Sequence, residues 1–110
     1  MAPKSTPYFV TIVTSQLSFD HDPEGYKAHR EELSAVVAKQ AGFISAEVTC
    51  EGPKSISLTY WETQEAMTAW AKSAEHQEMK AKSHAGGWIQ SVSIEIAQVS
   101  HKMEFPPRHA

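Results

Sequence analysis

The stretch SISLTYWETQEAMTAW, residues 55–70, decides the fold because the spacing of its apolar residues changes partway through. Up to Trp61 the residues alternate as in a strand, whereas after Thr63 apolar residues recur at helical spacing. Thr63 also has a side chain that commonly caps a helix. The inward-facing residues predicted for this helix are Ala66, Met67 and Trp70. The stretch therefore predicts a strand, residues 55–61, that leads directly into a helix.

Three further segments are predicted to be strands because they are rich in β-branched and aromatic residues. They are residues 8–17, 43–50 and 88–99. With one helix predicted between the first two strands and another before the last, the order is β-α-β-β-α-β. This order is the split βαβ pattern of ferredoxin-like folds, an α+β class with a four-stranded antiparallel sheet and both helices on one face.

Capping residues give the expected helix ends. Asp22 and Pro23 are suited to start the first helix, and Gly42 to end it. Ser73 is a second capping residue, so the later helix is expected to break or bend near 72–74 and to continue to about residue 85. The pair Gly86-Gly87 is then suited to reverse the chain.

The composition predicts one small globular domain. The 110 residues divide into a loose lead (1–7), a single domain (8–99) and an extended tail (100–110). The formal net charge of −3 argues against nucleic acid or an acidic membrane as a partner. A lone cysteine, Cys50, without an apolar leader or a membrane-length apolar run, favours a cytoplasmic location.

Apolar residues point to both faces of the predicted sheet. In the first strand Tyr8, Val10 and Ile12 face one way, and the alternate apolar residues, among them Phe9 and Val13, face the other. Two helices can cover only one face, and leaving half a dozen large apolar side chains in water would be costly, at ~1.5–3 kcal/mol for each. We therefore expect a homodimer that packs sheet to sheet.

Neither a metal nor a nucleotide cofactor is predicted. His76 and His84 are eight residues apart, which places them about 12 Å apart along one helix, too far for one ion. The five glycines form no GxGxxG motif and no phosphate-binding loop. We therefore expect no cofactor and no metal site.

Several short motifs in a fixed order resemble the antibiotic biosynthesis monooxygenase family. They are VTSQ (13–16), GY (25–26), AGF (41–43) and, most specifically, YWETQEAMTAWAKSAEH (60–76). The resemblance covers roughly residues 8–99. It implies a ferredoxin-like chain that pairs into a dimeric α/β barrel. Some members of the family oxidise aromatic quinols with O₂ and no cofactor, in a pocket between sheet and helices.

Two departures from related proteins bear on function. Haem-degrading relatives use an asparagine on the first strand, and this chain contains none, which argues against haem binding or degradation although Trp70 matches their tryptophan. Relatives often have an arginine in the turn before Trp88, followed by tyrosines. Here the turn is Gly86-Gly87 and Ile89 follows Trp88, so either the ligand is more apolar or the pocket is vestigial.

The aromatic residues at the strand–helix junction have two interpretations. They form either the packed core or the wall of an apolar cavity that holds a small apolar or aromatic molecule. In the second interpretation the protein is a monooxygenase for a small quinol-type compound; alternatively it is a non-catalytic binding or interaction protein of the same fold. His76 and Tyr60 are the candidate catalytic residues, because either could accept a phenolic proton. The candidate pocket-lining residues are Trp61, Trp70, Thr14, Gln16, His29 and Thr59.

Overall fold

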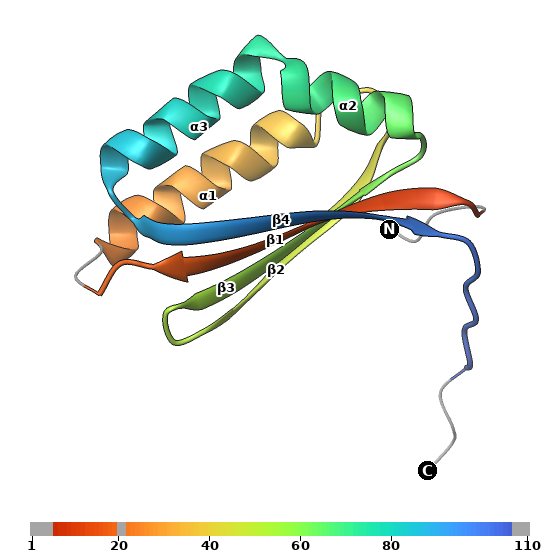
Figure 1. The fold of residues 1–110 in the computed structure, drawn as a ribbon, viewed down its shortest axis with the longest axis horizontal. Coiled ribbons are helices and arrows are strands. Elements are labelled where there is room, and N and C mark those ends of the chain that lie inside the picture. Colours follow the sequence, from red (N-terminus) through yellow and green to blue (C-terminus); the bar gives the residue numbers. More distant parts are fainter. Residues whose placement is uncertain (1–5, 20–21, 107–110) are drawn as a thin grey trace.

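The fold was analysed in a computed structural model, which describes residues 6–19 and 22–106. One layer of helices lies over a single four-stranded sheet (Figure 1). The strands are β1 (Tyr8–Leu17), β2 (Phe43–Glu51), β3 (Lys54–Trp61) and β4 (Ile89–Val99), and the helices are α1 (Pro23–Val37), α2 (Gln64–Lys72) and α3 (Ala74–Gly86). This arrangement confirms the predicted α+β class and the ferredoxin-like order, with the second helix divided in two.

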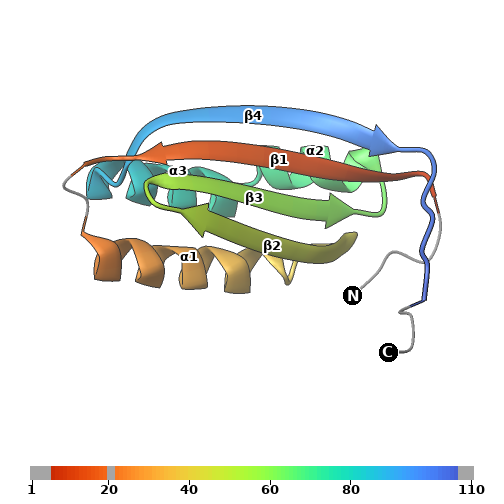
Figure 2. The same ribbon diagram turned by 90° about the horizontal axis from the view of Figure 1, so that it is seen from below.

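The sheet is antiparallel throughout, with strand order β2-β3-β1-β4. β1 and β3 are therefore central, and β2 and β4 are the edges. All three helices lie on the same side of the sheet, which leaves the other face open (Figures 1 and 2). We call these the helix-covered face and the open face.

The predicted break in the later helix is confirmed at Ser73. The Ser73 hydroxyl accepts a hydrogen bond from the backbone N–H of His76 at 3.0 Å and donates one to the Trp70 carbonyl at 2.8 Å. Thr63 caps α2 in the same way, accepting from the N–H of Ala66 at 3.0 Å. Ser73 thus pairs one carbonyl at the end of α2 and one N–H at the start of α3, which helps the chain to change direction there.

The first helix starts at Pro23 as expected, whereas its expected end needs a correction. The helix stops at Val37, five residues before Gly42, and the Gln40 side chain donates to the Val36 carbonyl at 3.0 Å within the following turn. Gly42 instead takes a positive φ of 81° inside that turn. Asp22 occupies the cap position before Pro23, but its side chain makes no capping hydrogen bond.

The strand register assigns each residue to a face. Phe9, Trp61 and Phe43 lie opposite one another in one row, and this row packs with Val37 of α1 and Met67 of α2. The odd-numbered residues of β1 and β3 therefore lie on the helix-covered face, whereas the even-numbered ones lie on the open face. The main core thus gathers at the end of the sheet where β3 passes into α2.

Apolar residues on both faces confirm the sequence pattern. On the open face Tyr8 and Val10 are buried by their neighbours, and Ile12 is partly buried. On the helix-covered face, the edge strand β4 extends past the helices. Its side chains there are well exposed: Val92 at 55%, Ile94 at 60% and Ile96 at 61%.

The ends of the chain add no regular element to the described part. Residues 101–106 form neither helix nor strand and are exposed. The predicted lead and tail fall partly outside the described residues, at 1–5 and 107–110. None of the described helices combines the length and the apolar character that a membrane-crossing segment needs.

Candidate functional site

The middle of the helix-covered face is built from small side chains. Beyond the aromatic row of Phe9, Trp61 and Phe43, the rows become Thr11, Thr59 and Ala46, then Val13, Ser57 and Val48, then Ser15, Ser55 and Cys50. We call the four central residues of the two middle rows the floor: Thr11, Val13, Ser57 and Thr59. All four are only partly buried although they lie on central strands beneath helices. Close packing would bury such positions completely, so the space between floor and helices is not filled as densely as a core.

Trp70 and His76 lie together at the junction of α2 and α3, and Trp70 also lines a pocket of about 290 Å³ with Gly42 and Thr63. Their rings meet edge to face, with centroids 5.1 Å apart and an interplanar angle of 73°. Trp70 also packs on the main core, and both side chains are partly buried. The Ser73 cap fixes the start of α3, which holds the pair in this arrangement.

His76 is the candidate general base that the structure positions best. Burial lowers its pKa from the ordinary value of 6.5, with Lys80 acting in the same direction and the Ala71 carbonyl partly opposing the change. The imidazole is therefore neutral at pH 7. Its Nδ1 atom is buried and has no hydrogen-bond partner among the described residues.

Trp61 is a core residue. Its side chain is 0% exposed, it meets Phe43 edge to face at 6.1 Å, and it packs against Val37 and Met67. Its indole Nε1 is buried without a hydrogen-bond partner in the described part of the chain. Of the two aromatic residues predicted to line a pocket, Trp70 is therefore the one with exposed surface to offer a ligand.

Tyr60, Thr14 and Gln16 lie on the open face, because each is an even-numbered residue of β1 or β3. Tyr60 meets Tyr8 edge to face at 6.0 Å, and burial, followed by the nearby Glu47 carboxylate, raises its pKa. These three residues are thus separated by the sheet from Trp70 and His76. The predicted site residues do not all line one pocket.

His29 and Thr59 lie on the helix-covered side. Thr59 belongs to the floor, and His29 projects from α1 and is buried. The His29 ring stacks on Trp88, with centroids 5.1 Å apart and planes 29° from parallel, and Tyr26 approaches the same indole at 6.4 Å. Burial lowers the pKa of His29, while Glu32 partly opposes this change. His29 is therefore neutral at pH 7 and packs at the end of the layer opposite Trp61.

Sequence reasoning missed Arg30, which brings a cation to the helix-covered side of the sheet. Its guanidinium lies 5.4 Å from the centroid of the Tyr26 ring, and its Nη1 donates weakly to the Cys50 sulfur at 3.7 Å. Its Nε atom is buried without a partner in the described ranges. Helical spacing could have located it, since Tyr26, Arg30 and Leu33 share one side of α1.

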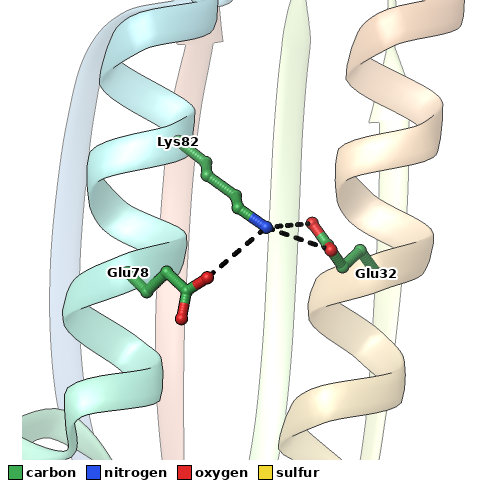
Figure 3. A network of polar contacts seen from close by, with 3 residues as sticks. All are labelled: Glu32, Glu78 and Lys82. Atoms are coloured by element: carbon green, nitrogen blue, oxygen red, sulfur yellow. Dashed lines mark hydrogen bonds and ion pairs between the residues drawn. The ribbon is translucent and has the colours of Figure 1, made fainter.

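The outer surface of the helix layer is tied by a charged network (Figure 3). Lys82 of α3 lies 3.1 Å from the Glu32 carboxylate of α1 and 3.7 Å from Glu78 one turn earlier on α3. The carboxylates raise the pKa of Lys82. An open groove of about 510 Å³ runs beside this network and reaches His29 and Trp88.

No group of three or more histidine, cysteine, aspartate or glutamate side chains within residues 6–19 and 22–106 is arranged to hold a metal ion. Cys50 is a free, exposed thiol. The layer therefore offers hydroxyls, imidazoles, a guanidinium and aromatic rings as its chemical groups.

Comparison with known proteins agrees with this architecture. SnoaB, a cofactor-independent oxygenase from Streptomyces nogalater, superposes with a TM-score of 0.72 at 11% identity, covering 93% of this chain and 100% of SnoaB. A Deinococcus radiodurans protein assigned to antibiotic biosynthesis monooxygenases has a TM-score of 0.78 at 9% identity, covering 90% and 99%. At such identities these likenesses show the fold alone.

Sequence comparison adds the family. The uncharacterized protein YqjZ of Bacillus subtilis strain 168 is 29% identical over 100 residues, which cover 90% of this chain and 85% of that protein. The family model for antibiotic biosynthesis monooxygenases matches residues 9–82, well over half of the chain. The chain therefore belongs to the antibiotic biosynthesis monooxygenase family.

Proposed function

We propose that the protein is a cofactor-independent monooxygenase for a small aromatic, quinol-type compound that binds between the sheet and the helices. The observation that carries this proposal is the pairing of Trp70 with a neutral His76 whose buried Nδ1 has no partner among the described residues. Family membership and the likeness in fold to an oxygenase that works without a cofactor support the same reaction class.

In the proposed reaction the substrate supplies all the electrons. A phenol reacts with O₂ to give a quinone and water: one oxygen atom enters the ring and the other leaves as water. The four electrons that reduce O₂ come from the ring, which gains a C=O group and loses two hydrogens. The protein contributes removal of the phenolic proton, orientation of the ring and exclusion of water.

Each group in the layer has a proposed role. His76 accepts the phenolic proton, because a neutral imidazole with its pKa below 6.5 has a lone pair available at pH 7. The exposed part of Trp70 orients the aromatic ring by stacking or edge contact. The hydroxyls of Thr11 and Thr59 on the floor are suited to bind substrate oxygens. Tyr60, on the open face, is left outside this site.

The test is O₂ consumption in the presence of a panel of quinols. We expect turnover by the wild type and a loss of about 10²–10⁴-fold in kcat for His76→Gln, the size of effect typical for removal of a general base. His84→Gln is the matched control, since His84 is exposed on the same helix, and it should leave turnover unchanged. Trp70→Ala should raise KM. If no quinol is oxidised but aromatic compounds still bind, the protein is a non-catalytic binding protein.

We also infer that the protein works as a homodimer, in the cytoplasm as its single cysteine favours. The open face supports this inference: half a dozen apolar side chains there have no helix over them. These are Ile12, Ile56, Leu58, Tyr60, Ala97 and Val99, and all are only partly buried. Sedimentation equilibrium should give about twice the 12.2 kDa of one chain. A folded 12.2 kDa particle at micromolar concentration would contradict this inference.

A further inference from the structure

Arg30 lies between α1 and the sheet without a carboxylate to neutralise it. Among the described residues no ion pair includes it, and its contacts are the Tyr26 ring at 5.4 Å and the Cys50 thiol at 3.7 Å. A thiol is a weak acceptor, so these contacts leave most of the guanidinium donors unused. Its Nε–H is buried, and a buried donor that lacks an acceptor destabilises the fold.

Glu31 and Glu32 follow Arg30 directly, but neither lies one helical turn from it on the same side of α1. The helix positions one turn before and after it are Tyr26, Lys27, Leu33 and Ser34, none of them acidic. The carboxylates of β2, Glu47 and Glu51, belong to the open face, because Cys50 and its alternate neighbours face α1. The cation is therefore available to a bound anion on the helix-covered side.

The position of Arg30 relative to the floor indicates the shape of that anion. Cys50 is in the last row of small residues, with Ser55 and Ser15, six residues along β3 from Trp61. Six residues of strand span ~20 Å. A flat molecule with its acidic end at Arg30 would extend past the buried Ser15 and Ser55 over the floor, and it would need most of this length to bring a ring near Trp70.

We propose that Arg30 binds the carboxylate of an aromatic acid, and that the substrate class of this protein is therefore an elongated phenol that carries a carboxylate at the end far from His76, rather than a neutral phenol. The assignment of this acid as a substrate rests on the proposed function, whereas the assignment of Arg30 as its binding residue does not. A planar guanidinium with several free N–H groups matches a carboxylate in a two-point contact, which a neutral ring oxygen cannot reproduce. The Tyr26 ring beneath it holds the guanidinium plane in place.

The test compares two probes of equal shape, 2-naphthoate and 2-naphthamide, by calorimetric titration of the intact protein. The wild type should bind the charged probe more tightly. Arg30→Met should weaken 2-naphthoate about 10- to 100-fold, the range for a charge-assisted hydrogen bond, and leave 2-naphthamide unchanged. The control is Lys27→Met, which removes an exposed cation three residues away on the same helix and should alter neither affinity.

Three results would overturn the proposal. They are equal affinity of the wild type for the two probes, an equal loss of both in Arg30→Met, and no binding of either probe by the wild type. Arg30→Lys, which keeps the charge but not the fork geometry, should recover part of the affinity for 2-naphthoate if the variant folds as the wild type does. Because binding is measured without turnover, an absence of O₂ consumption would refute the monooxygenase and leave the acid-binding site standing.

Discussion

Ser57→Leu tests whether the space between the sheet and the helices is open. Ser57 lies on the floor between Val13 and Val48 of the neighbouring strands and is only partly buried. In a closed core the larger side chain would overpack, which typically costs ~1–3 kcal/mol. In an open layer it would instead remove apolar surface from water, at ~0.8 kcal/mol for each methylene buried. We therefore expect the unfolding free energy to stay within about 1 kcal/mol of the wild type or to rise.

The assay combines thermal unfolding with ligand titration. A change of 1 kcal/mol shifts the Tm of a domain of this size by ~4–8 °C, so overpacking would produce a clearly measurable decrease in Tm. At the same time the leucine should weaken 2-naphthoate binding more than about 10-fold, because it occupies the volume that the ring needs. The control is Ser34→Leu, which adds the same side chain at an exposed position of α1 and should leave affinity unchanged.

Either of two results would refute the reasoning. If Ser57→Leu lowers the Tm by the amount expected of an overpacked core, the layer is closed. If its stability is maintained and the probe still binds with wild-type affinity, the ligand binds elsewhere.

Gly42→Ala should lower the unfolding free energy by more than ~1–2 kcal/mol, since φ is 81° and the new Cβ would collide with Cβ of Ala66; a neutral result in urea unfolding would mean that the turn relaxes. Ser73→Ala should cost ~1 kcal/mol by removing the cap of α3, and an unchanged unfolding midpoint would contradict the capping role. Acidification through pH 6.5 should lower stability, because burial lowers the pKa of His29 and His76 in the folded state, so the unfolded chain takes up more protons. Unfolding curves over a pH series should show a shallower decline for His76→Gln, whereas an equal decline would assign the effect to other groups.

The elements could be predicted because their signals are local. Alternation predicted β3, and richness in β-branched and aromatic residues predicted the other three strands. The capping chemistry of Ser73 was enough to place the division between α2 and α3. The end of α1 was predicted too late because a glycine indicates that a turn is present but not how many residues of the turn precede it. The helix stops at Val37, and Gly42 takes its positive φ only where the chain enters β2.

The pocket residues were harder to predict because several elements have to be placed at once. Tyr60 and Trp61 are adjacent on a strand and so must face opposite sides of the sheet, which already separates two of the predicted residues. Which side the helices cover could not be read from β3 alone, because both faces carry apolar residues. The register with β1 and the contacts of α2 settle this, by placing Trp61 in the core.

Arg30 was overlooked because an arginine on a helix is usually solvated. Its importance depends on a contact with a segment distant in sequence, the Cys50 thiol on β2. Relatives often carry an arginine in the turn that is Gly86-Gly87 here, so the sequence predicted a pocket that had lost its positive charge. The structure instead has a cation on α1, so the layer is not purely apolar, and an acidic ligand becomes a more specific expectation than an apolar one.

The sizes of the floor residues explain why one end of the layer is a core and the other a candidate site. Where β3 meets α2, Phe9, Trp61 and Phe43 fill the gap beneath the helices and stabilise the fold. Toward the other end the rows consist of alanine, serine, threonine, valine and cysteine, whose smaller side chains fill less of the same gap. At their far ends the helices are positioned by the packing of His29 on Trp88, and the exposed Lys82–Glu32 ion pair also links α3 to α1. A layer held at both ends and lined by small side chains between them is suited to a flat molecule, and the groups facing it then decide which one.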